Sequence, residues 1–130
     1  KICKPEKDNG VKTTLELLGV EDRPTAFIST NANLTLEVLK GVRMAGLHVP
    51  NDISVIGYDD FDWTPLLDPP LTTVAISGFD MGVKAANLLI KKMKRKQKKK
   101  PEIYNIMPEL IIRNSAGIAK PSFELSQQDK

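Results

Sequence analysis

Two adjacent carboxylates, Asp59 and Asp60, directly follow an apolar segment that runs from Ile53 to Tyr58. This apolar pattern predicts a strand that is buried on both faces of a parallel sheet. Ligands of such sheets bind outside the carboxyl ends of the strands, so Asp59 is predicted to face a ligand rather than the core. Alternatively, Asp59 could bond backbone N–H groups of its own turn. Asp60 and Asp62 are predicted to be solvated or to form turns.

Asn31 follows a second β-rich segment, residues 25–29, which is also predicted to be a buried strand. A helix is predicted from Leu34 to Ala45, so residues 25–58 form a strand–helix–strand unit. Such a unit is nearly always a right-handed parallel crossover, which brings the carboxyl ends of both strands to one edge. Asn31 is therefore expected beside Asp59, where its amide could contact a ligand or cap the helix.

Trp63 is the only tryptophan and lies four residues after Asp59, in a proline-rich loop. An indole ring beside a carboxylate could contact the apolar face of a pyranose ring, which makes Trp63 a further candidate for ligand contact. It could also be a hydrophobic plug that closes the loop onto the domain, or an interface residue.

The remaining segments complete an alternating helix and strand pattern. The predicted helix 34–45 carries an apolar stripe of Leu36, Leu39 and Val42. The other expected elements are a helix at 10–18, an irregular segment at 61–70, a strand at 71–76, an amphipathic helix at 82–93 and two short strands around Pro108 within 102–115.

Length and composition favour one globular domain. The chain has 130 residues, of which 41% are hydrophobic and 27% charged, and no apolar run approaches the ~20 residues that span a bilayer. The single cysteine, Cys3, cannot form an internal disulfide, which favours a reducing compartment. Because the chain starts at Lys1 without a methionine or an apolar leader, a fragment or a trimmed product is expected.

Positive charge is concentrated in residues 91–100, KKMKRKQKKK, which hold eight of the 19 basic residues and no acidic residue. The rest of the chain has 11 basic and 16 acidic residues, unlike a DNA-binding domain with a broad basic face. A solvated helix end is the preferred interpretation, and electrostatic binding of nucleic acid remains the alternative.

A family resemblance rests on several segments in a fixed order. RPTAFISTNA, AGLHVPNDISVIGYDD, PPLTTV, the pair Met81–Gly82 and PELIIRNS together resemble the C-terminal half of the effector-binding core of bacterial transcription regulators of the lactose/galactose repressor family. The resemblance covers about residues 11–115. It implies an α/β fold with a doubly wound parallel sheet, similar to periplasmic sugar-binding proteins, in which two lobes hold a small effector between them.

The resemblance also implies how the chain is divided. Residues 1–72 correspond to the C-terminal lobe, 73–101 to a strand and helix of the N-terminal lobe, 102–117 to return strands and 118–130 to a loose tail. Most of the N-terminal lobe and any DNA-binding headpiece would lie outside this sequence. The helix 82–93 would then lack its partner lobe and leave an apolar face, which self-association or an altered packing is expected to cover.

Carried over by position, Asn31 and Asp59 match residues that hydrogen-bond the effector in this family. Leu36 and Leu67 match positions in the family's dimer interface. The family usually has an aspartate directly after the asparagine, whereas this chain has Ala32. The implied protein is a cytoplasmic homodimer without a cofactor, which senses a sugar or a related metabolite and binds operator DNA only through the missing headpiece.

Other classes of protein fit less well. A glycosidase needs two carboxyl groups about 5–10 Å apart, and here no nucleophile, base or metal-ligand set accompanies the aspartates. The only histidine, His48, is predicted to lie on the surface of a helix-to-strand turn. An enzyme is therefore not expected, and the runner-up is a solute-binding protein of a sugar uptake system.

Overall fold

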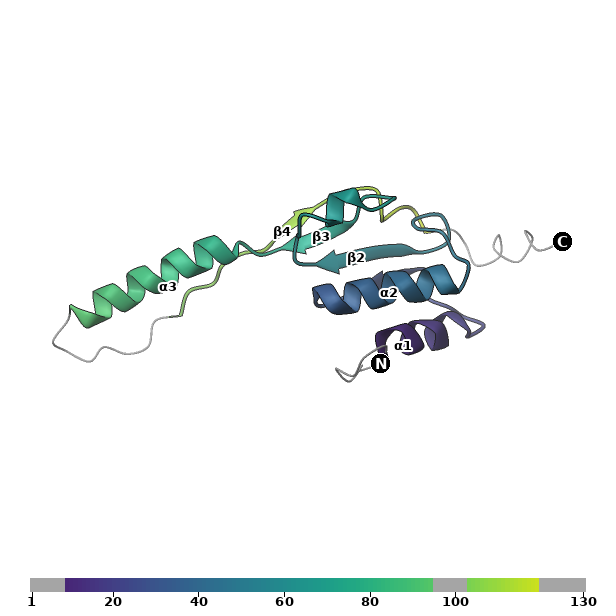
Figure 1. Cartoon of the computed structure of the whole chain (residues 1–130), viewed down its shortest axis with the longest axis horizontal. Coiled ribbons are helices and arrows are strands. Elements are labelled where there is room, and N and C mark those ends of the chain that lie inside the picture. Colours follow the sequence, from purple (N-terminus) through teal and green to yellow (C-terminus); the bar gives the residue numbers. More distant parts are fainter. Residues whose placement is uncertain (1–8, 95–102, 120–130) are drawn as a thin grey trace.

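The computed structural model describes residues 9–94 and 103–119, which form three α-helices, one short 3₁₀-helix and four strands (Figure 1). In chain order the elements are α1 (Asn9–Leu18), β1 (Ala26–Ile28), α2 (Ala32–Met44), β2 (Ser54–Tyr58), η1 (Thr64–Leu66), β3 (Thr72–Ala75), α3 (Gly78–Met93) and β4 (Glu109–Ile111).

The four strands form one sheet in the order β1-β2-β3-β4. β2 pairs in parallel with both β1 and β3, and β4 pairs antiparallel with β3. The predicted α/β fold with a parallel-dominated sheet is confirmed. The predicted unit 25–58 is also confirmed, because β1 and β2 are parallel and α2 connects them.

The small apolar core lies between α2 and the sheet. Its buried members are Val38, Val42, Ile53, Val55 and Leu71. α2 packs on β2, and on its other side α2 contacts α1 (Figure 1). α2 covers β2, and a strand pairs with it on each side. The side chain of Val55 therefore has no solvent exposure, as the apolar pattern predicts.

The predicted stripe of α2 is confirmed at Val42, which is buried, and at Leu39, which packs against the core, but it is wrong at Leu36. The helix buries Thr35, Val38, Gly41 and Val42, whereas Leu36 is 48% exposed. Two neighbouring elements determine which face of α2 is buried. The two valines pack against the sheet, and α1 packs against Gly41. Apolar periodicity missed the face because two of its four buried residues are a threonine and a glycine.

The predicted burial of segment 25–29 is also wrong. β1 is an edge strand, and Ile28 is 70% exposed, although Ser29 just after it is buried. An edge strand pairs on only one side, so its apolar composition does not guarantee burial within this chain.

Glycine permits the close contact between α1 and α2. A Cβ atom on Gly41 would lie 2.8 Å from Cβ and Cγ2 of Thr14 and 3.3 Å from the carbonyl oxygen of Val11. The backbone N–H of Gly10 also donates to Oε2 of Glu37 at 2.6 Å, which ties the start of α1 to α2.

α3 lies apart from the sheet and core (Figure 1). It begins at Gly78, four residues before the predicted start, because Oγ of Ser77 caps it by accepting from the N–H of Asp80. The helix buries none of its residues, and Phe79 is 80% exposed. The expected altered packing that would cover the apolar face of this helix is therefore wrong, and cover by self-association stays a prediction. Its Lys84 ammonium lies 4.2 Å from the ring centroid of Tyr104 in the return segment.

The return segment contains one strand where two were predicted. β4 follows Pro108, while residues 103–107 form no helix or strand. Residues 95–100 of the basic run, Cys3 and residues 120–130 of the predicted loose tail lie outside the described residues. No helix in the described part of the chain is long and apolar enough to cross a membrane.

We expect Gly41→Ala to lower the free energy of unfolding. Overpacking against Thr14 costs about 1–3 kcal/mol, and the better helix propensity of alanine offsets only about 1 kcal/mol. Urea denaturation of both chains measures the difference. Gly82→Ala in α3 is the matched control, because its Cβ would meet no atom within 4 Å, and it should not destabilise the fold. A Gly41→Ala chain as stable as the wild type would contradict the tight α1–α2 contact.

Candidate functional site

The carboxyl ends of β1, β2 and β3 form one edge of the sheet. The three strands are parallel and in register, so the residues that follow them emerge side by side. The backbone N–H of Ser29 donates to the carbonyl of Ile56 at 3.0 Å, and that of Asp59 donates to Val74 at 2.9 Å. The structure therefore brings Asn31 and Asp59 to the same edge, as their positions after two parallel strands predict.

Asn31 caps α2 at this edge. Its backbone is extended, and its Oδ1 accepts from the N–H of Leu34 at 2.9 Å. Below it, Oγ of Ser29 and Oγ1 of Thr35 form a buried hydrogen bond of 2.6 Å, and Thr35 Oγ1 also donates to the Asn31 carbonyl. The capping bond uses the amide oxygen, so the amide NH₂ group is left to donate hydrogen bonds.

The first turn of α2 sits close to β2 because Gly57 has no side chain. A Cβ atom there would lie 3.2 Å from Cγ2 of Thr35 and 2.9 Å from Cδ2 of Leu71. A larger residue at Gly57 would push the start of α2, and with it Asn31, away from the edge.

Asp59 has a backbone φ of 65°, the only non-glycine residue in the left-handed region among the described residues. This conformation costs about 1–2 kcal/mol for most residues, although aspartate tolerates it better than most. The left-handed residue turns the chain sharply at the end of β2 and presents the half-buried Asp59 at the edge.

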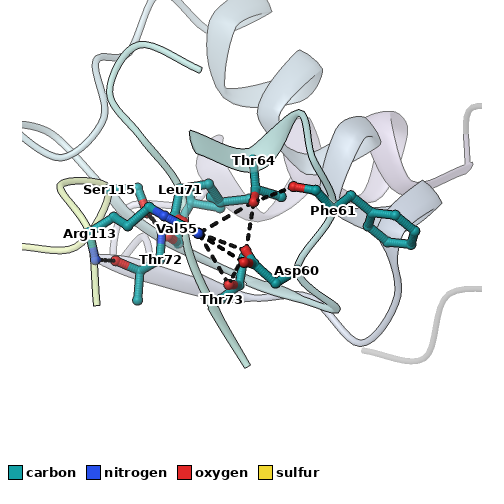
Figure 2. A network of polar contacts seen from close by, with 9 residues as sticks. All are labelled: Val55, Asp60, Phe61, Thr64, Leu71, Thr72, Thr73, Arg113 and Ser115. Atoms are coloured by element: carbon teal, nitrogen blue, oxygen red, sulfur yellow. Dashed lines mark hydrogen bonds and ion pairs between the residues drawn. The ribbon is translucent and has the colours of Figure 1, made fainter. Parts of the chain in front are cut away.

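Asp60 forms the centre of a polar network with Arg113 (Figure 2). The Arg113 guanidinium donates from Nη1 to Asp60 Oδ1 at 2.7 Å and from Nη2 to Oδ2 at 2.9 Å, so the ion pair is bidentate. Asp60 Oδ1 also accepts from Thr64 Oγ1 at 2.6 Å and Thr73 Oγ1 at 2.7 Å. The side chains are only 21% exposed for Asp60 and 17% for Arg113.

The ion pair shifts the pKa of both partners. The guanidinium of Arg113, helped by the two threonine hydroxyls and opposed by burial, holds the pKa of Asp60 well below its usual value. The carboxylate in turn raises the pKa of Arg113. The prediction that Asp60 is solvated or forms a turn is therefore wrong: it is an ionised anchor.

Comparison with known proteins identifies the fold. The periplasmic binding protein-like domain family matches residues 4–116. This chain belongs to that family.

Relatives of this periplasmic binding protein-like chain are transcription repressors. An arabinose metabolism transcriptional repressor of Geobacillus stearothermophilus is 41% identical over 95 residues, which are 73% of this chain and 26% of the relative. The HTH-type transcriptional repressor PurR of Histophilus somni is 40% identical over 110 residues, 85% of this chain and 33% of the relative. The resemblance to the lactose/galactose repressor family is thereby confirmed, and the chain spans a quarter to a third of these relatives.

A solved structure shows the same fold. The LacI family transcriptional regulator from Enterococcus faecalis V583, with bound ribose, is 31% identical with a TM-score of 0.75, and the match covers 88% of this chain and 42% of that one.

The other predicted residues of this periplasmic binding protein-like chain lie beside the edge or away from it. Trp63 packs against the core and stacks on Phe61, with ring centroids 5.9 Å apart and planes inclined by 5°. This packing fits the alternative of a hydrophobic plug, and ligand contact by Trp63 stays a prediction. Leu67 also packs against the core, while Leu36 is half-exposed on α2.

The sequence did not point to Arg113, which is 53 residues from Asp60 and reaches it only because β4 pairs with β3. The available signal was weak: an arginine directly after the apolar run LII. The described residues contain no group of three His, Cys, Asp or Glu that could hold a metal ion. His48 is exposed as predicted, and its ring lies 3.3 Å from Asp52 Oδ2.

We expect the stability of the fold to depend on ionised Asp60. Because its folded-state pKa is depressed, its contribution is present above the unfolded-state value of about 3.9 and is lost as the pH falls through the folded-state pKa. Asp60→Asn should lower the free energy of unfolding by about 1–3 kcal/mol at neutral pH, and the difference from the wild type should shrink in acid. Urea denaturation across this pH range measures both effects.

Asp62→Asn is the matched control, because Asp62 is an exposed carboxylate two residues away. It should match the wild type at neutral pH and in acid. Equal stability of Asp60→Asn and the wild type at neutral pH would contradict the anchoring role of Asp60.

Proposed function

We propose that this chain provides one wall of an effector cleft in a transcription regulator, and that the effector is a sugar or a similar small polar metabolite. The main support is the joint position of Asn31 and Asp59 on the carboxyl edge of a parallel sheet, which is where such folds bind ligands. Relatives of this chain are named as repressors, which favours a regulator over a solute-binding protein of an uptake system.

The chemistry of the edge suits a polyol. The Asp59 carboxylate accepts hydrogen bonds from two hydroxyl groups, and the Asn31 amide donates after its oxygen has capped α2. The Enterococcus faecalis regulator was solved with ribose, which supports a sugar as the ligand class. Trp63, four residues after Asp59 and only partly buried, would line the cleft beside it.

We also propose the division of the chain into lobes. Residues 1–72 form the C-terminal lobe, 73–101 contribute to the other lobe, 102–117 return and 118–130 form a tail. The support is α3, whose apolar face is exposed throughout; a large unpartnered apolar face marks an interaction surface. An effector that binds the two lobes better in one relative orientation would shift that equilibrium and thereby change DNA binding by a headpiece. The protein would act in the cytoplasm and would not be an enzyme.

We expect Asp59→Ala in the complete regulator to weaken effector binding. Loss of a charge-assisted hydrogen bond inside a closed cleft costs about 1.5–3 kcal/mol, which is roughly a 10- to 150-fold higher Kd. Titration calorimetry with D-ribose, D-glucose, sucrose and L-arabinose identifies the sugar and measures its affinity. The matched control is Asp62→Ala, which should bind like the wild type. An unchanged Kd for Asp59→Ala would exclude Asp59 from the site.

Self-association through Leu36 and Leu67 is a separate proposal, and the structure supports it at Leu36. Leu36 is half-exposed on α2, and one and two turns further along the same side of the helix lie Lys40 and Met44. These two residues line an apolar groove of about 410 Å³ between α1 and α2, together with Val11, Lys12, Leu15 and Glu16. A second copy of the chain that packs along this side of α2 would cover both Leu36 and the groove.

We expect Leu36→Glu to shift the complete regulator from dimer to monomer, because a buried carboxylate without a partner is strongly unfavourable in an interface. Sedimentation velocity at low micromolar concentration measures the change. Val20→Glu is the control, because Val20 is similarly exposed, at 51%, but follows α1. A dimer unaffected by Leu36→Glu would move the interface elsewhere.

A further inference from the structure

The loop that carries Asp59 is attached to strand β3 and to a distant arginine. On one side the Asp59 N–H donates to the Val74 carbonyl of β3. On the other side the next residue, Asp60, is fixed by the guanidinium of Arg113 and by the hydroxyl of Thr73, also in β3. The left-handed backbone of Asp59 lies between these two attachments.

We propose that Arg113 is a positioning residue for Asp59 and acts through Asp60. In this role Arg113 couples the returning segment, which contains β4, to the carboxyl edge of the sheet where Asp59 lies. This inference rests on the proposed function, because it assigns a regulatory role at the same edge. A backbone in the left-handed region persists only where its surroundings fix it. The bidentate ion pair does so at the residue directly after Asp59.

Arg113 is in turn fixed by the strand that returns to the lobe. It comes two residues after β4, which pairs antiparallel with β3. Its backbone N–H donates to Thr72 Oγ1 at 2.9 Å, and its Nη1 donates to the carbonyl of Leu71 at 2.7 Å. Figure 2 shows the guanidinium pointing between Asp60, Thr64 and Thr73.

Through this arrangement, the position of the returning segment affects the turn at Asp59. A shift of β4 along β3 would move the Arg113 guanidinium relative to Asp60 and would release the turn at Asp59. Residues before Arg113 in that segment are exposed, among them Leu110 at 54% and Ile112 at 77%, so they are available to contact the other lobe. Occupation of the edge and the position of β4 then affect each other, as linkage requires.

A neighbouring contact in the same returning segment supplies a control that is similar in kind. Ser115 Oγ donates to the Val55 carbonyl at 2.6 Å and accepts from the Thr72 N–H at 2.8 Å. It attaches the same returning segment to the sheet without contacting the loop of Asp59. Ser115→Ala therefore weakens the attachment and leaves the ion pair in place.

The first measurement needs no ligand. Amide hydrogen exchange of Asp59, followed by NMR in the complete regulator, reports whether its N–H bond to Val74 is held. We expect exchange at least roughly tenfold faster in Arg113→Gln and Asp60→Asn than in Ser115→Ala, after the exchange rates of remote core amides are used to correct for global stability. Arg113→Lys should fall between, because lysine keeps the charge and loses the bidentate geometry. Equal exchange in Arg113→Gln and Ser115→Ala would overturn the positioning role.

The second measurement tests the link to the effector. The sugar that binds the wild type, from D-ribose, D-glucose, sucrose and L-arabinose, should bind Arg113→Gln with a Kd about 5- to 150-fold higher, while Ser115→Ala keeps wild-type affinity. The double variant Asp60→Asn/Arg113→Gln should be no weaker than the worse single variant, because both changes remove one ion pair. Unchanged affinity in Arg113→Gln would overturn the link.

The two proposals can fail separately. If the wild type binds none of the sugars, the sugar assignment is wrong, and the exchange rates of Asp59 alone decide the role of Arg113. If the wild type binds a sugar and the Asp59 amide is equally protected in Arg113→Gln, the sugar assignment stands and the positioning role is wrong.

Discussion

The parallel pairing of β2 with both β1 and β3 is the constraint on which the rest of the structure depends. Parallel neighbours end at the same edge of the sheet. Strand pairing alone therefore brings together the residues that follow three separate strands. The pairing also explains why β2 is so apolar, because α2 covers it and a strand flanks it on each side. Gly57 completes the arrangement by letting the first turn of α2 approach the strand.

Hydroxyl groups stabilise the fold alongside a small apolar core. Among the described residues only five apolar side chains form the buried cluster, and buried threonines and serines fill the space around it. These are Thr14, Ser29, Ser54, Thr35, Thr64, Thr72, Thr73 and Ser115. Within the described part of the chain, no buried side-chain nitrogen or oxygen lacks a hydrogen-bond partner. A satisfied polar network of this kind fixes geometry more strictly than apolar contact does, because hydrogen bonds are directional.

The ion pair of Asp60 and Arg113 belongs to this network and differs from a surface salt bridge. Exposed pairs contribute little, since solvent screens them and long side chains lose entropy. Here the pair is bidentate, about four-fifths covered, and shared with two threonines and a backbone carbonyl. It joins segments that are 53 residues apart, so the loop after β2 and the return after β4 cannot form their native geometry independently. By contrast, α3 has no such attachment to the core, and its exposed apolar face is consistent with a partner lobe.

The sequence by itself determined the order and type of the main elements, the parallel crossover from β1 to β2, and therefore the shared edge of Asn31 and Asp59. These features depend on local pattern and on the handedness of the chain, which neighbouring residues specify. Tertiary structure alone decided that Ile28 is exposed on an edge strand, that Thr35 and Gly41 replace Leu36 on the buried side of α2, and that Asp60 is an anchor. Each of these depends on which distant segment lies opposite, and no local pattern encodes the pairing of β4 with β3 that brings Arg113 to Asp60.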